Sequence, residues 1–225
     1  MKIGLTTFIS SLVVFLPLII IILRKKYLTK ELKILFLYVI ASIGFEIFSI
    51  TWAKILHIPN HFILNTFALT EGILISSIFQ EAFINKKLKK NTFILIIIYT
   101  LVSIYLFIMP NGFFKFNSIV NALSCLLIIV WVFVYFYQLL QTLQVIKLYT
   151  LPLFWISVGC LLYFSGTLFI FLYSDTILFQ KEPILYYQLW NIYYVLLFVF
   201  RVLLAIGLWF SKTAFQLSNS PSNLN

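Results

Sequence analysis

Long runs of apolar residues, separated by short polar or basic segments, follow one another along the whole chain. A helix needs about 20 apolar residues to cross the hydrocarbon core of a bilayer. Strands of a membrane barrel would instead alternate over about 10 residues, and the runs here are continuous. We therefore predict an all-α integral membrane seven-helix bundle. The predicted spans lie at about residues 4–23, 34–53, 61–83, 92–109, 117–143, 151–173 and 185–211.

The division of the chain follows from these spans. Residues 1–211 would form a single seven-helix transmembrane domain, and no segment between the spans is long enough for a further domain. The polar residues 212–225 would form a disordered cytoplasmic tail, since they offer few apolar side chains for packing.

Basic residues between the spans are unevenly divided between the two sides of the predicted membrane. Eleven lie on one side, within residues 24–33 and 86–90, at Lys147 and at Lys212, and four lie on the other side. Cytoplasmic loops carry an excess of Lys and Arg. The bias therefore predicts an N-terminus outside and a C-terminus in the cytoplasm.

The amino-acid composition supports the membrane prediction and indicates which classes of partner the chain would bind. The chain has 225 residues, of which 63% are hydrophobic, whereas soluble domains are about 45–50% apolar. The net charge of +10 comes from short basic runs beside the spans, where anionic lipid headgroups explain it. We therefore expect membrane lipids as partners and no nucleic acid. The oligomeric state stays open.

Two segments of the chain can be superposed as an internal repeat. Residues 61–67 align with residues 187–193, which pairs Asn65 with Asn191 at the outer ends of the third and seventh spans. This pattern suggests a 3+1+3 arrangement with two parallel triplets, a symmetry found in some transporters. Chance similarity is the alternative in a chain so biased in composition.

Three ionisable residues, Glu46, Glu71 and Arg201, fall well inside predicted spans. Charges at this depth are costly and usually face the interior of a bundle or a water-filled cavity. At 1.5 Å per residue they lie roughly 20, 22 and 16 Å from the basic residues at the cytoplasmic ends of their spans. We therefore expect one interior cluster, with Tyr194 on the same face as Arg201.

Small and polar side chains form a stripe on each of the second and third spans. Such stripes let helices approach closely. The stripes consist of Ser42, Glu46, Ser49 and Ala53 on the second span and of Ala68, Gly72 and Ser76 on the third.

Two carboxylates facing one guanidinium would leave one negative charge uncompensated. We expect one glutamate to hold a proton and pair with the other groups, which would serve proton coupling or ligand recognition. The alternative is a static Arg–Glu pair that fixes the register of the helices without binding a ligand. The candidate ligand- or proton-binding residues are Glu46, Glu71, Arg201, Tyr194, Asn65 and Asn191.

Residues that could carry catalysis or hold a metal are few. His57 and His61 have a spacing that would suit a metal on a helix, but Pro59 lies between them in a predicted loop. Ser165 in a span has no base to activate its hydroxyl, and Ser165-Gly166 is better interpreted as a packing point. We predict no enzyme, no metal and no cofactor.

Three segments of the chain carry a resemblance: NTFALTE, PLFWISVGCLLYFSGTLFIFLYS and NIYYVLLFVFRVLLAIGLWF. Together they resemble an uncharacterised bacterial family of small seven-span integral membrane proteins. The resemblance covers the third span and about the second half of the chain, and it implies a multi-pass protein of the bacterial cytoplasmic (inner) membrane that accompanies signalling proteins. The family pattern has an amide near position 201, from which Arg201 departs.

These observations favour a non-enzymatic membrane sensor or signalling module. It would bind a small or lipidic ligand, or respond to the membrane state, and act on a cytoplasmic or membrane partner. The alternative is a small proton-coupled transporter that uses Glu46 or Glu71. A continuous polar cavity lined by both glutamates would favour transport, and a tightly packed interior would count against it.

Overall fold

A computed structural model describes residues 10, 12–55, 60–109, 112–142, 148–180 and 183–218 of the chain. Within these ranges all regular structure is helical, which confirms the predicted all-α class. The elements are α2 (Phe15–Arg24), η1 (Lys25–Tyr27), α3 (Lys30–Ile55), α4 (His61–Ala82), α5 (Lys86–Ile108), α6 (Ser118–Thr142), η2 (Leu148–Thr150), α7 (Pro152–Gln180), α8 (Pro183–Trp209) and α9 (Ser211–Ser218).

Six of the described helices, α3 to α8, are long and apolar enough to cross a membrane. They coincide with six of the seven predicted spans, and they make the chain a multi-pass membrane protein by length and composition. The predicted first span, 4–23, lies partly outside the described residues, and α2 covers residues 15–23 of it. The seventh crossing therefore stays a prediction.

Three helices extend well beyond their predicted spans, and α3 does so at both of its ends. Helix α5 starts at Lys86 and not at residue 92, because the basic run is itself helical and its N-cap Asn85 accepts a hydrogen bond from the backbone of Lys87 at 2.8 Å. Helix α7 continues to Gln180, beyond the predicted end at residue 173. Apolar runs mark the membrane core of a helix, whereas polar residues extend the same helix beyond it.

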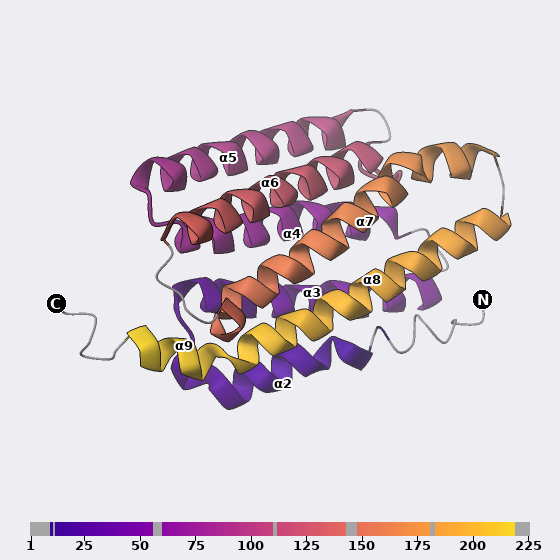
Figure 1. Cartoon of the computed structure of the whole chain (residues 1–225). Helices are drawn as coiled ribbons and strands as arrows, with labels where there is room; N and C mark the ends of the chain where they lie inside the picture. The colour runs from indigo at the N-terminus through magenta and orange to yellow at the C-terminus, as the bar shows by residue number, and fades with distance from the viewer. Residues whose placement is uncertain are drawn as a thin grey trace.

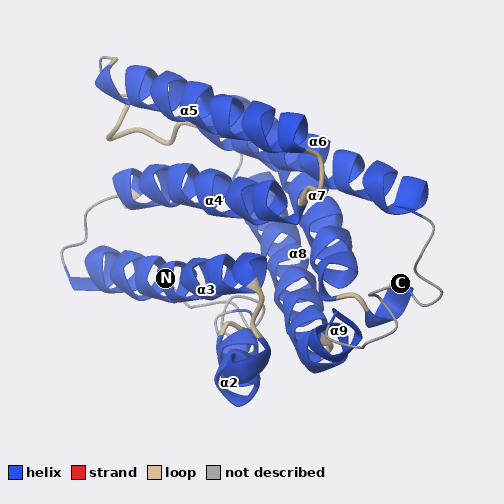
Figure 2. Cartoon of the chain, turned by 90° about the vertical axis from the view of Figure 1, so that its left-hand side faces the viewer, coloured by secondary structure: helices blue, strands red, loops and turns tan. Residues whose placement is uncertain are grey.

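Successive long helices run in opposite directions and pack side by side (Figure 1). Helix α4 lies centrally, against α3, α5 and α6, while α7 packs on α6 and α8. Helix α2 lies at one edge of the bundle, where it packs mainly on α8 and less on α3, and α5 forms the opposite edge (Figure 2). The interior of the bundle is therefore built around α4, α7 and α8.

Large side chains fill the interior, and apolar side chains also cover the outside. Tyr163 of α7 and Phe200 of α8 are fully buried and stack with ring centroids 4.9 Å apart. On the outer face of α5, Leu101 is 61% exposed and Ile108 78% exposed. An apolar surface of this kind is stable when it faces lipid chains instead of water.

The small-residue stripe of α4 packs as predicted. Ala68, Gly72 and Ser76 are all buried, and Tyr99 from α5 contacts the stripe at Gly72 and Ala68. A Cβ atom added to Gly72 would come within 2.7 Å of the Tyr99 ring, and the Tyr99 hydroxyl donates a hydrogen bond to the Ala68 carbonyl at 3.1 Å. Glycine at this position therefore permits the contact between α4 and α5.

The segment after the last span begins with a short helix. We expected disorder from residue 212, whereas α9 continues to Ser218. Its Phe215 packs edge-on against Tyr27 of η1, with ring centroids 5.7 Å apart. An aromatic partner in the first loop accounts for this order, and residues 219–225 lie outside the described part of the chain.

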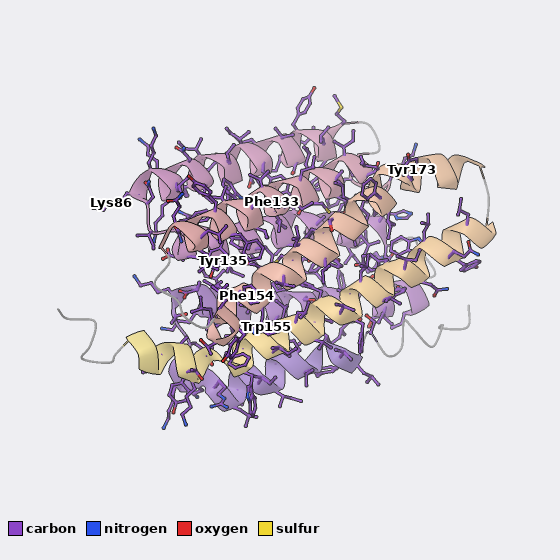
Figure 3. All side chains as sticks on the ribbon, viewed as in Figure 1. Lys86, Phe133, Tyr135, Phe154, Trp155 and Tyr173 are labelled. Atoms are coloured by element: carbon purple, nitrogen blue, oxygen red, sulfur yellow. The ribbon has the colours of Figure 1, made fainter. Side chains whose placement is uncertain are left out.

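The basic segments on the predicted cytoplasmic side meet at one end of the bundle. The α2–α3 connection, the start of α5 and α9 all lie at the left-hand end of Figure 1. Figure 3 shows Lys86 at this end and Tyr173 towards the other. Lys147 lies outside the described residues. This grouping fits the predicted topology, while the orientation relative to the cytoplasm stays a prediction.

Candidate functional site

Arg201 of α8 connects three parts of the chain inside the bundle. Its Nη2 atom donates to Oε2 of Glu46 on α3 at 2.5 Å, and its Nη1 atom donates to the backbone carbonyl of Ser10 at 2.6 Å. The Arg201 side chain is 6% exposed and that of Glu46 is 20% exposed. The ion pair therefore ties α8 to α3 and to the chain just before α2.

Glu71 of α4 has a different partner. The hydroxyl of Tyr38 on α3 donates to Oε1 of Glu71 at 2.8 Å, and both side chains are buried. Among the described residues no cation lies within salt-bridge distance of Glu71, although Arg201 still interacts with it electrostatically. The expected cluster of three is thus divided into an ion pair and a hydroxyl–carboxyl pair.

Tyr38 was missed by the sequence analysis, although a signal for it existed. It precedes Ser42 by four residues, so it extends the predicted polar stripe of α3 by one helical turn. A tyrosine in an apolar span is usually interpreted as a packing residue or an interfacial anchor. Its role here depends on the neighbouring helix, which brings Glu71 to its hydroxyl.

An aromatic cluster packs beside these two pairs. The Phe200 ring lies 6.2 Å from that of Tyr38 and stacks on Tyr163. The hydroxyl of Tyr163 donates to that of Tyr193 at 3.3 Å. Because Phe200 precedes Arg201 on α8, the same turn of this helix contacts both the Tyr38–Glu71 pair and the Glu46 pair.

A small hollow of about 140 Å³ lies between the start of α2 and α3. Glu46 is the polar residue of its lining, and Glu71 does not line it. Several lining side chains are exposed on the outside of the bundle, including Leu12 at 54% and Ile47 at 56%. The hollow, called here the Glu46 hollow, is lined by Leu12, Val14, Phe15, Ile43, Glu46, Ile47 and Ile50.

Asn65 is another predicted site residue, and its side chain makes hydrogen bonds within the protein. It is completely buried, and its Nδ2 atom donates to the carbonyls of Phe113 and Lys115 at 3.0 and 2.7 Å. Its Oδ1 atom accepts from the backbone N–H of Asn117 at 3.0 Å. The side chain therefore holds the connection between α5 and α6.

The remaining predicted site residues lie apart from this arrangement. Asn191 is exposed on α8, so it does not share the buried environment of Asn65, with which the repeat would pair it. Tyr194 is half-buried, and its ring lies 5.4 Å from that of Tyr193. It therefore adjoins the aromatic cluster.

The residues considered for metal binding and catalysis have packing roles where they are described. His61 begins α4, and its ring lies 6.3 Å from that of Phe116, whereas His57 lies outside the described residues. A Cβ atom added to Gly166 would come within 2.5 Å of Leu196 on α8. Ser165-Gly166 is therefore a site of close helix packing, as its sequence suggested.

At its far end α8 makes a second set of contacts with the α2 region. The guanidinium of Arg24 lies over the Trp209 ring, 4.5 Å from its centroid, and α9 reaches η1 through Phe215 and Tyr27. Helix α2 is thus held by α8 at both ends, through Arg201 at one and Trp209 at the other.

Comparisons with known proteins add no relationship to this geometry. No protein-family model matches the chain, and neither the curated proteins nor the solved structures contain a match. The resemblance to a bacterial seven-span family therefore stays a prediction.

Proposed function

We propose that the chain is a non-enzymatic membrane module that binds a small or lipidic ligand and acts on a cytoplasmic or membrane partner. The observation that carries this proposal is the double attachment of α8. The helix contacts Glu46 and Ser10 inside the bundle through Arg201, and it contacts Arg24 at the basic end through Trp209. A shift at one attachment displaces groups at the other.

The output would be the basic end of the bundle. Lys25 and Lys26 are exposed, and they belong to η1, which packs on α9. Exposed lysines attract acidic surfaces and anionic headgroups. Movement of α8 would therefore change how this basic surface is presented to a partner.

A photocrosslinking experiment in the native host tests this proposal. A benzoylphenylalanine at position 26 is expected to capture a partner, and the yield should change several-fold in the double variant Glu46→Met, Arg201→Met at equal membrane level. The same probe at Leu101, which is 61% exposed on α5 at the opposite edge, controls for chance contacts. The proposal would be refuted if the same adducts formed at both positions. It would also be refuted if the crosslinking yield at position 26 were the same in the wild type and in the double variant.

Proton-coupled transport is the second candidate function. It requires both glutamates on one polar cavity, whereas Glu46 lines an apolar hollow and Glu71 bonds to Tyr38. In proteoliposomes with an internal pH dye we expect no proton flux above that of empty vesicles. A flux that disappears in both Glu46→Gln and Glu71→Gln would restore the transporter to first place.

A further inference from the structure

We propose that a bound water molecule joins α5 to α6 inside the bundle, held by the hydroxyl groups of Tyr99, Ser103 and Ser124. The observation that carries it is a pair of buried serine hydroxyls, one on each helix. Both interact with the same phenol, yet neither has a hydrogen-bond partner among the described residues. The inference is independent of the proposed function, because it involves neither the ion pair of Arg201 nor the basic end.

The two serines lie deep in the protein. Ser103 of α5 is 0% exposed and Ser124 of α6 is 2% exposed. A buried hydroxyl that makes no hydrogen bond loses its hydration without compensation. Buried polar groups in folded proteins are therefore nearly always paired, either within the chain or with ordered water. Both serines accordingly need a partner that the described part of the chain does not supply.

Other hydroxyls in these helices show that the two serines are oriented differently. A serine or threonine within a helix usually bonds to the carbonyl four residues earlier. For Ser103 that carbonyl belongs to Tyr99, and for Ser124 it belongs to Val120, yet neither bond forms. The hydroxyls that do make such a bond are those of Thr66, Thr70, Ser77, Thr92, Thr100 and Thr167.

Tyr99 supplies the third group of the site. It is 6% exposed, and its hydroxyl donates to the carbonyl of Ala68 on α4 at 3.1 Å. Its only proton is thus in use, and the phenol oxygen can still accept. The phenol interacts with both serine hydroxyls, although neither stands in hydrogen-bonding geometry to it. Polar groups that approach without bonding directly are commonly bridged by water.

The hydrogen-bond inventory of the three groups selects water as the ligand. A water molecule donates to the Tyr99 oxygen and accepts from both serines, which gives the three bonds typical of a buried water. An anion has no proton for the Tyr99 oxygen, and it would lie near the carboxyl group of Glu71, which also interacts with Tyr99. An ammonium ion donates only, so it would leave the serine protons unpaired. Because α5 packs less on α6 than on α4, the bridge adds a link where direct packing is sparse.

X-ray hydroxyl-radical footprinting of the purified full chain in nanodiscs tests the proposal. Radiolysis forms the radical from water itself, so a buried side chain is oxidised quickly when a water molecule is held beside it. Tyr99 is expected to be oxidised several-fold faster than Tyr38, which is 3% exposed and bonds directly to Glu71. In water enriched in heavy oxygen, the product should carry the heavy isotope. Equal oxidation of the two tyrosines would overturn the proposal.

A pair of variants tests which groups hold the water. The double variant Ser103→Ala, Ser124→Ala removes two of the three partners, and oxidation of Tyr99 should fall several-fold. Thr100→Val is the matched control, since it removes a neighbouring hydroxyl of α5 that bonds within its own helix, and oxidation should be unchanged. Undiminished oxidation in the serine double variant, or an equal loss in Thr100→Val, would overturn the assignment to the serines.

Unfolding in SDS tests whether both serines share one water molecule. Removal of either serine breaks the bridge, so the midpoint shift of the double variant should be smaller than the sum of the two single shifts. Additive shifts would mean that the hydroxyls act separately and would overturn the bridge. The comparison of Tyr99 with Tyr38 in the wild type needs no variant, so it decides the proposal even where a variant fails to fold.

Discussion

Glu46 and Glu71 are the same residue type at similar depth in neighbouring spans, yet the fold treats them differently. Glu46 bonds to a guanidinium, is partly exposed and borders a hollow at the edge of the bundle. Glu71 bonds to a tyrosine hydroxyl and lies 7% exposed between tightly packed helices. The difference shows that depth in a span does not determine the role of a carboxyl group, because its partner and the packing around it do.

The glycines next to the two glutamates in the sequence lie in different environments. Gly44, two residues before Glu46, has no atom within 4 Å of an added Cβ, whereas Gly72, directly after Glu71, meets the Tyr99 ring at 2.7 Å. Gly44 is exposed on another face of α3 than Glu46, since residues two apart on a helix do not face each other, whereas Gly72 is buried in the contact between α4 and α5. The tight packing at Gly72 supports a structural role for Glu71.

The largest effect is expected when the ion pair loses one partner. Arg201→Met leaves the Glu46 carboxylate without its guanidinium, and breaking a buried pair in this way costs about 3–5 kcal/mol. The partial exposure of Glu46 should place the loss near the lower end of that range. Unfolding in SDS, followed by tryptophan fluorescence, measures it. The double variant Glu46→Met, Arg201→Met should recover most of the stability, and a double variant as unstable as the single one would contradict the pairing.

An intermediate effect is expected from packing beside Glu71. Gly72→Ala forces the Tyr99 ring to move, and overpacking of this kind costs about 1–3 kcal/mol. Gly44→Ala is the matched control, since its new methyl group meets nothing within 4 Å and alanine is the better helix former by up to about 1 kcal/mol. Equal unfolding transitions for the two variants would mean that the Tyr99 ring accommodates the added methyl group at Gly72 without a loss of stability.

The smallest effect is expected from removal of the charge at position 71. Glu71→Gln keeps an oxygen that accepts from Tyr38 and carries no charge, so the change in unfolding free energy should stay below about 1 kcal/mol. Tyr38→Phe, which removes the donor instead, should cost about 1–3 kcal/mol because a buried acceptor is left without a partner. If Glu71→Gln proves as damaging as Arg201→Met, the charge of Glu71 is required and the comparison fails.

Several parts of the site could be anticipated from residue types and spacing. The polar stripe of α3 identified Ser42 and Glu46 as inward-facing, and the stripe of α4 identified the close approach at Gly72. The pairing of Glu46 with Arg201 agrees with their expected depths. These features were accessible because helical periodicity and rise relate position in the sequence directly to face and depth.

Other parts could not be anticipated, because they depend on how helices rotate and lean against each other. Asn65 has the residue type of a binding group, but the loop after α5 reaches its side chain and uses both its donor and its acceptor. The bond between Arg201 and the Ser10 carbonyl joins residues 191 positions apart. No local pattern encodes such a contact.

The sequence by itself determined that the chain is a helical, multi-pass membrane protein. A run of about 20 apolar residues is enough for a segment to cross the bilayer as a helix, whatever the rest of the chain does. It also indicated that the three ionisable groups within the spans face the bundle, since lipid cannot solvate them. Only the tertiary structure decided which group pairs with which. It placed Tyr38 on Glu71, Arg201 on Glu46, and the hollow beside Glu46, because partner choice follows from side-chain packing between helices and not from the polarity of any one helix.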